Sequence, residues 1–501
     1  MPSNFLIEYR ERLREYYSAL HRETYLFDSG KKNQLETRFY AADYSDLFSA
    51  TVRNELQKEL TETAAFRETE RAAIQLLIAN ATHENLLATG WELTEEIQAY
   101  ESQASPIWEG KRIEFQTARQ LLNREPDARR RHDLAARCRE TVKGAQDLRA
   151  ERWEKLHDAA KGMGETSYLA LYQKLRDVDY EALAKQAQQI LAQTENKYVS
   201  VFAPLLAREA GVTLDEAVSA DLGYWQQFHR FDKHFPAWQL KHVYRETYAG
   251  LGILTYQQPN ITLDDQPRAN KTLKVRHFPI RVPEDIKVLF TTADGVRTFT
   301  AFLQETNHAQ QEAWMSRNLH TEFRYCGDAA RSKGFALLFS QLPQDARWLA
   351  DLLTFYESHE LRHLLAVQKL MRIRRAAAKL NYEVELHAGQ LGSTAGTRFS
   401  ELLMDAVRVR YDESEHLREV EDGFAVADDL RAWAFEAQLR EHLKTKYGSR
   451  WWTSRKAGDF LIDLWNTGGR YKLEEMAKMI DLGELSFDWL AEECLADLRE
   501  T

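Results

Sequence analysis

The sequence predicts a mostly α-helical fold with one small β-sheet. Of its 501 residues only 22 are glycine and 10 are proline, about half of the roughly 12% that these two residues reach on average. Helix breakers and tight turns are therefore scarce. Hydrophobic residues make up 44% of the chain and aromatic residues 11%, which is enough for a large core and excludes global disorder. We expect one structural unit spanning residues 1–501.

Residues 1–250 read as one helix after another. Leu56, Leu60 and Ala64 recur every four residues, which is the spacing of an apolar helical face. The segment 128–156 is rich in Arg, Glu and Ala and predicts an exposed helix with charge pairs between residues four apart. No period of 20–50 residues recurs, so a solenoid is not expected.

Residues 251–297 interrupt the helices and hold four of the ten prolines. Two runs with β-strand character lie here, Thr272–Val282 and Ile286–Thr292, and Ala293-Asp294-Gly295 supplies a turn after the second run. This segment predicts the sheet.

Helices return from Val296 onward. Asp345 to about His387 predicts one very long helix, or two joined without a breaker, because no glycine or proline lies between Pro343 and Gly389. Its basic run, residues 369–379, predicts a charged outer face, with the lining of a channel for anionic peptides as the alternative. The other predicted helices are Val296–Ser316, Ser332–Leu342, 399–412, 426–446, 455–466 and 472–480.

Composition narrows the class of protein. The 67 Lys and Arg residues against 77 Asp and Glu residues give a net charge of −10, so we expect no nucleic-acid partner. The three cysteines, Cys138, Cys326 and Cys494, are far apart, which argues against a disulfide framework or a Cys-type zinc site. No signal-peptide core and no run of 18 apolar residues is present. We therefore expect a cytoplasmic protein without membrane association, and the sequence indicates no oligomeric state.

The helix after the predicted strands carries Gln304-Glu305-Thr306-Asn307-His308. Zinc peptidases with a His-Glu-x-x-His motif need two imidazoles at i and i+4, which lie on one helical face and bind one metal. They also need a Glu after the first His as general base, and a third ligand from a later helix.

With these residues the chain resembles the helical zinc peptidases that include angiotensin-converting enzyme, thimet oligopeptidase and oligoendopeptidase F, and among them the bacterial members. The resemblance runs from about residue 200 to the C-terminus. It implies a two-lobed helical clam around a central channel, with the small sheet beside the metal-type helix and approximate lobes of 1–250 and 251–501. It is carried by the stretches Arg281–Ile286, Leu303–Gln310, Phe323–Asp328, Ser332–Phe339 and Leu430–Trp433.

The chain departs from the family pattern at the metal ligands. The resemblance places Gln304 where the first His ligand stands and Lys333 where the Glu ligand stands, while Glu305 keeps the place of the general base and His308 that of the second ligand. The oxyanion-stabilising tyrosine of the family falls at Ala425 or Asp429.

These replacements disfavour zinc. An ammonium about 4 Å from a divalent ion is repelled by roughly 8 kcal/mol at an effective dielectric of 20, and an amide oxygen is a poor zinc ligand beside imidazole. We therefore expect no cofactor, and we expect Lys333 to neutralise Glu305 as an ion pair.

A literal motif, His359-Glu360-Leu361-Arg362-His363, is the alternative metal site. It lies inside the long predicted helix, and its two histidines share a face with apolar residues, which suggests a packing role. Glu383, a candidate third ligand, would lie about 30 Å from His363 along a continuous helix. A break between residues 364 and 382 would reopen this alternative.

The sequence thus favours a pseudopeptidase, a catalytically impaired zinc-peptidase-like protein that binds a peptide or protein partner in the family channel. One alternative is an active metallopeptidase of the oligopeptidase class that binds zinc through His308, Glu305 and a non-standard ligand. A second alternative is a helical scaffold protein.

Overall fold

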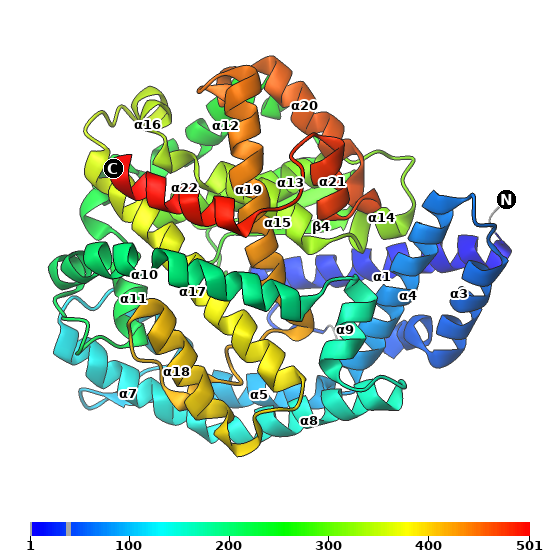
Figure 1. The fold of residues 1–501 in the computed structure, drawn as a ribbon, viewed down its shortest axis with the longest axis horizontal. Helices are drawn as coiled ribbons and strands as arrows, with labels where there is room; N and C mark the ends of the chain where they lie inside the picture. The colour runs from blue at the N-terminus through cyan, green and yellow to red at the C-terminus, as the bar shows by residue number, and fades with distance from the viewer. Residues whose placement is uncertain (1–2, 37–41, 501) are drawn as a thin grey trace. The chain divides into compact units, whose positions relative to one another are not determined.

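The computed structural model describes residues 3–36 and 42–500 (Figure 1) and confirms a mostly α-helical fold with little sheet. The chain forms two compact units, and each unit draws on several separate stretches. Unit 1 comprises Met1–Asn85, Arg230–Ser358 and Arg431–Leu485, and unit 2 comprises Leu86–His229, His359–Leu430 and Ser486–Thr501. The sequence had indicated approximate lobes of 1–250 and 251–501 instead.

Unit 1 combines helices with a three-stranded sheet. Its strands are β3 (Ile261–Asp264), β4 (Arg276–Arg281) and β5 (Asp285–Leu289). Its α-helices are α1 (Asn4–Asp28), α3 (Ala50–Glu62), α4 (Glu68–Ala88, ending in unit 2), α12 (Leu240–Gly250), α13 (Val296–Ala313), α14 (Thr321–Tyr325), α15 (Ala329–Ser340), α16 (Ala346–Leu353), α19 (Ala425–Tyr447, beginning in unit 2), α20 (Arg455–Asn466) and α21 (Leu473–Met479). Its 3-10 turns are η1 (Ser45–Phe48), η2 (His229–His234), η3 (Ala237–Gln239), η4 (Thr255–Gln257), η5 (Leu342–Gln344), η9 (Trp451–Thr453) and η10 (Gly468–Arg470).

The sheet lies between α1 and α13. Its order is β3-β5-β4, with β3 parallel and β4 antiparallel to β5. Side chains alternate across β4, because successive residues of a strand point to opposite faces. Phe278 and Ile280 are buried with Tyr25 of α1, whereas His277 faces α13. The alternation of side chains along β4 therefore places His277 against α13, the helix that carries the candidate site.

The two predicted strands are confirmed at shorter lengths, and a third strand was missed. β3 is only four residues long and follows directly after Pro259 and Asn260, so its period-two pattern is too brief to stand out in the sequence.

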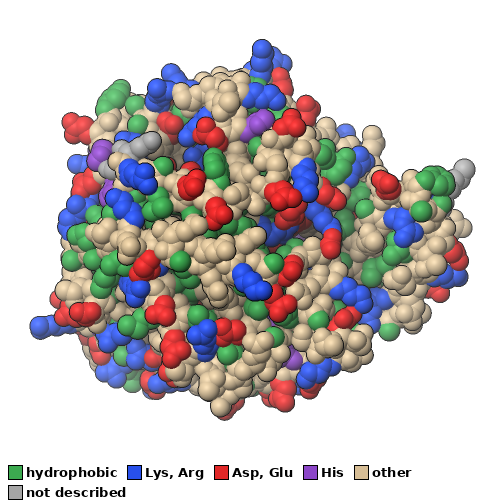
Figure 2. Space-filling model, in the orientation of Figure 1, with side chains coloured by type: hydrophobic (Ala, Val, Ile, Leu, Met, Phe, Trp, Pro, Cys, Tyr) green, Lys and Arg blue, Asp and Glu red, His purple; other side chains and the backbone are tan. Residues whose placement is uncertain are grey.

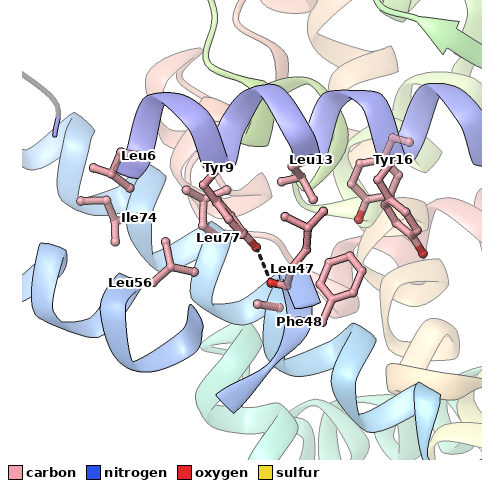
Figure 3. Close-up of a cluster of buried hydrophobic side chains, with 11 residues drawn as sticks. Leu6, Tyr9, Leu13, Tyr16, Leu47, Phe48, Leu56, Ile74 and Leu77 are labelled. Carbon is pink, nitrogen blue, oxygen red and sulfur yellow. Dashed lines mark hydrogen bonds between the residues drawn. The ribbon is translucent and has the colours of Figure 1, made fainter. Parts of the chain in front are cut away.

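An aromatic and aliphatic cluster fixes the N-terminal helices of unit 1 (Figure 3). Tyr9 of α1 donates its hydroxyl to the Leu47 carbonyl of η1 at 3.3 Å. Leu13, Leu56 and Leu77 are fully buried in the same cluster. These contacts hold α1 in place, and α1 in turn packs along β4.

Unit 2 is built almost entirely of helices. Its α-helices are α5 (Trp91–Gln103), α6 (Phe115–Leu122), α7 (Ala128–Gly144), α8 (Gln146–Gly162), α9 (Tyr168–Arg176), α10 (Tyr180–Ala210), α11 (Ser219–Trp225), α17 (His359–His387), α18 (Ala395–Val407) and α22 (Phe487–Glu500). It also holds the 3-10 turns η6 (Gly392–Thr394), η7 (Glu413–Glu415) and η8 (Asp422–Phe424). A two-residue hairpin, β1 (Ile107–Trp108) and β2 (Lys111–Arg112), was not predicted.

Two basic segments of unit 2 are more buried than the sequence suggested. The predicted helix 128–156 is two helices, α7 and α8, and its Arg131 is fully buried against Asp221, with 2.6 Å between guanidinium and carboxylate. In α17, Lys369 and Arg374 are buried, with the ammonium of Lys369 2.6 Å from the Glu493 carboxylate. The prediction that residues 369–379 form a charged outer face is therefore wrong: buried arginines and lysines here are paired, as desolvation requires.

The long helix predicted from Asp345 to His387 is two helices. Thr354 takes a left-handed conformation (φ 51°) and ends α16, and an irregular segment then leads to His359, where α17 begins. From His359 to His387, α17 continues without a break.

The surface shows mixed charge. On the face drawn in Figure 2, acidic and basic side chains are interspersed, with hydrophobic ones scattered between them. Within residues 3–36 and 42–500, no helix combines the length and the apolar character needed to cross a membrane.

Candidate functional site

The candidate site lies on the partly exposed face of α13. The helix begins after Gly295, whose φ of 113° is open to glycine but not to most residues. A Cβ at Gly295 would also lie 2.7 Å from the Asp232 carboxylate. Val296, Phe299 and Phe302 recur at helical spacing and are buried. The opposite face therefore carries the polar residues of the site: Gln304, Glu305, His308 and Glu312.

Glu305 is bound by His277 of β4. The Nδ1 atom of His277 lies 2.7 Å from Oε2 of Glu305, and the backbone N–H of His277 donates to the same oxygen at 3.1 Å. Both side chains are largely buried, with 23% and 20% of their surface exposed. The carboxylate at the position of the general base is thus held by a neighbouring strand.

The second nitrogen of His277 faces another carboxylate. Its Nε2 atom lies 3.3 Å from Oε1 of Glu312, seven residues after Glu305 on the same helix. Burial alone would lower the pKa of His277, but the charges and hydrogen bonds of Glu312 and Glu305 outweigh it and raise the pKa to about 10. Burial would conversely raise the pKa of Glu305, but the His277 imidazolium holds it below its usual value. At neutral pH the arrangement is an imidazolium between two carboxylates.

His308 lies beside this network as a neutral imidazole. Its ring stacks on the ring of His277, with 4.7 Å between centroids and 16° between planes. Its Nδ1 atom lies 2.8 Å from Oγ of Ser332 in α15. Burial, and then the positive charges of His277 and Lys333, lower the pKa of His308 to about 3, although Glu305 opposes the shift.

The structure brings Gln304, Glu305, His308 and Lys333 into one region, because α13 packs against α15. Gln304 and Lys333 are both partly buried, and the charge of Lys333 acts on His308. Glu305 has an ion-pair partner that the sequence reasoning did not include, His277 of β4. The sequence reasoning missed His277 because it drew its candidates from the metal-ligand pattern. The available signal was a histidine in the strand just before the metal-type helix.

Buried amides fix the position of α13. The Asn307 side-chain amide donates to the Tyr248 hydroxyl of α12 at 3.1 Å. The Gln311 amide donates to the Ser332 carbonyl of α15 at 3.0 Å. Buried polar groups that satisfy one another in this way define a single packing arrangement. They hold the candidate site at a fixed distance from α15, which carries Ser332 and Lys333.

Zinc does not fit the residues of this site. Zinc needs unprotonated imidazoles and free carboxylate oxygens, but both nitrogens of His277 face carboxylates and act as donors. Gln304 and Lys333 provide neither an imidazole nor a carboxylate. Across residues 3–36 and 42–500, no three His, Cys, Asp or Glu side chains are grouped so that they could bind a metal ion.

The literal motif at residues 359–363 lies at the start of α17. His359 is exposed, so the predicted packing role does not apply to it, and Glu360 pairs with Arg208 at 3.0 Å. His363 is partly buried, and burial lowers its pKa. Because α17 is continuous to His387, the break that would bring Glu383 to His363 does not occur.

The two residues to which the resemblance assigns the family tyrosine lie at the start of α19. Ala425 is its first residue and Asp429 lies one turn later. Neither side chain carries the phenol that the family pattern requires at this point.

The described residues form a helical protein in which a short strand pair leads into a polar-faced helix. The search of solved structures finds an X-ray structure provisionally assigned as oligoendopeptidase F, with a TM-score of 0.69 at 13% sequence identity. The match covers 98% of this chain and 90% of that chain. At this identity the likeness shows the fold. No family model and no curated protein matches the sequence.

Proposed function

We propose that the protein is a pseudopeptidase: it has the oligoendopeptidase-like fold, has lost zinc-dependent hydrolysis, and binds a peptide or protein partner. The observation that carries this proposal is the Glu305–His277–Glu312 arrangement at the place of the metal-type motif. A positive charge on His277 already pairs with both carboxylates without a metal. The residues at the expected ligand positions, Gln304 and Lys333, support the same proposal.

The same contacts make Glu305 a poor general base. A base must reach the proton it takes and must have a pKa near the working pH. The carboxylate of Glu305 accepts from the side chain and the backbone of His277, and the imidazolium keeps its pKa below the usual value. Both effects weaken proton abstraction from a water molecule.

Peptide binding is supported by the fold. The likeness to the oligoendopeptidase structure extends over nearly the whole chain, so the two scaffolds are alike.

The experiment combines binding and turnover in one sample. Fluorescently labelled, internally quenched peptides of 5–15 residues (roughly the length of a few strands) are titrated against the purified protein, and anisotropy and dequenching are followed together. We expect saturable anisotropy changes without dequenching, with or without added zinc. Zinc-dependent cleavage that is lost in Glu305→Gln would establish the active metallopeptidase instead. The absence of any saturable binding would favour the helical scaffold.

A further inference from the structure

We propose that unit 2 carries an anion-binding site, a cluster of five cationic side chains that binds a carboxylate or a phosphate group. The inference goes beyond the proposed function, because the cluster lies wholly in unit 2, whereas the candidate site lies in unit 1. Two of the cations, Arg375 and Lys379, belong to the basic run 369–379 of α17.

The cations come from three helices and one loop. α6 supplies Arg119, α8 supplies Arg149, α17 supplies Arg375 and Lys379, and Arg418 follows η7. The guanidinium groups of Arg119 and Arg418 both lie over the ring of Phe115, at 5.8 and 5.9 Å from its centroid. One aromatic ring therefore holds two like charges in the same region of the unit.

Two carboxylates serve Arg149 and Arg418. The carboxylate of Glu101 in α5 lies 2.5 Å from the guanidinium of Arg149 and 3.1 Å from that of Arg418. Glu415 of η7 lies 3.5 Å from Arg418. Burial raises the pKa of Glu415, although Arg418 and Arg119 oppose the shift, so Glu415 is a weak counter-charge.

A third carboxylate is shared by both cations of α17. Glu419 pairs with Arg375 and lies 3.9 Å from the ammonium of Lys379. Glu383, one turn after Lys379, adds little negative charge at pH 7, because desolvation raises its pKa to about 8.

The cluster therefore has more positive than negative charge. Among the described residues Arg119 has no carboxylate partner, and burial, followed by the charge of Arg418, lowers its pKa. Five cations thus face three carboxylates. Since an uncompensated charge is strongly unfavourable in a desolvated position, an anion that binds between these side chains removes the imbalance.

The cluster is accessible to a ligand and favours an oxyanion. The side chains of Arg375 and Arg418 are 31% and 19% exposed, so a ligand reaches them without unfolding of the unit. A guanidinium group presents its N–H donors in a planar fork that matches two oxygens of a carboxylate or a phosphate. A site built mainly from arginine side chains therefore favours these oxyanions over chloride.

The test compares inorganic phosphate with chloride at one ionic strength and pH 7. Phosphate should raise the unfolding temperature of the wild type, and calorimetry should give one phosphate per chain. Arg119→Gln should lower the phosphate affinity about tenfold or more, the usual effect of losing a hydrogen bond to a charged group. Because Arg119 has no ion pair to lose, Arg119→Gln should be at least as stable as the wild type in phosphate-free buffer.

Arg398→Gln is the matched control. Arg398 of α18 lies in the same unit, and Glu385 balances its charge, with both nitrogen–oxygen distances at 2.7 Å. The control should bind phosphate as tightly as the wild type. Equal phosphate affinity in the wild type and Arg119→Gln would overturn the inference, as would an equal loss in Arg119→Gln and Arg398→Gln.

A second pair of probes distinguishes the two sources of the anionic group, a free anion and an acidic side chain of a peptide. Tri-glutamate and tri-glutamine with blocked ends are titrated beside phosphate. Tri-glutamate that binds more tightly than phosphate and depends on Arg119 identifies an acidic peptide, whereas tighter binding of phosphate identifies a free anion. Failure of both to bind the wild type at millimolar concentrations overturns the inference.

This outcome is separable from the proposed function. Phosphate binding does not depend on the residues of α13, so its absence would leave peptide binding without turnover untouched. Peptide cleavage by the wild-type protein would refute the pseudopeptidase and leave the anion site in place.

Discussion

Replacement of His277 should destabilise the protein at neutral pH but hardly at all in alkaline solution. The folded-state pKa of His277 is raised from 6.5 to about 10 by Glu312 and Glu305, against the effect of burial. A base with a raised pKa contributes stability that is fully present below pH 6.5 and is lost as the pH rises through 10. The stability difference between wild type and His277→Gln should therefore close across this window.

The pKa shift sets the magnitude. A shift of about 3.5 units corresponds to a ceiling of about 5 kcal/mol at 1.36 kcal/mol per unit. Because the side chain retains 23% exposure, solvent screening should reduce this to about 2–3 kcal/mol. The neighbouring histidines do not obscure the effect. Burial keeps the pKa of His21 at about 4 and that of His308 at about 3, so neither titrates between pH 6 and 10.

The assay is urea unfolding of wild type and His277→Gln at pH 6, 8 and 10.5. His242→Gln is the control, since the side chain of His242 is 48% exposed and its nearest carboxylate, that of Glu246, lies 3.9 Å away. We expect the control to change the free energy of unfolding by less than about 0.5 kcal/mol at every pH. A loss in His277→Gln that is the same at pH 6 and pH 10.5 would refute the ion-pair reasoning.

Three further predictions follow from buried charges and from the ligand positions. Glu383 of α17 is fully buried, and desolvation raises its pKa to about 8, so the stability of the wild type falls as the pH rises from 4.5 to 8. Urea unfolding should show that Glu383→Gln increases the free energy of unfolding by about 3 kcal/mol at pH 7 and not at pH 4. An effect that does not depend on pH would contradict this prediction. Arg331 of α15 is 3% exposed, its Nε and Nη1 atoms have no hydrogen-bond partner among the described residues, and burial lowers its pKa to about 10. Arg331→Met should therefore stabilise the protein by about 1–3 kcal/mol and raise its melting temperature. A lower melting temperature would show that the charge is compensated in the wild type. The double variant Gln304→His/Lys333→Glu should bind zinc more tightly than the wild type, and the gain should be larger when His277→Ala is added. Calorimetry measures both affinities. An equal gain with and without His277 would show that His277 does not hinder metal binding.

The sequence was sufficient to predict the helix that carries the site. Gln304, Glu305 and His308 were found because a proline-rich strand segment leads directly into a helix with metal-type spacing. The same strand held the missing residue, His277, whose role depends on the register of β4 against β5 and on the packing of α13. Neither register nor packing can be read from a single strand, so His277 was not among the predicted site residues.

The burial of several charged residues also could not be predicted from the sequence. Arg131 and Arg374 lie in runs that read as solvated faces, yet both are fully buried. Their carboxylate partners, Asp221 and Glu195, are 90 and 179 residues away. Such pairs are set by tertiary contacts between distant helices, which local charge patterning does not reveal.

The metal content of the wild-type protein shows whether His277 occupies the place of a metal ion. The protein is expressed with zinc in the medium, purified without chelators, and analysed by mass spectrometry of the elements, with His308→Ala prepared in parallel. We expect far less than one zinc per chain in both proteins. One zinc per wild-type chain that is lost in His308→Ala would contradict it.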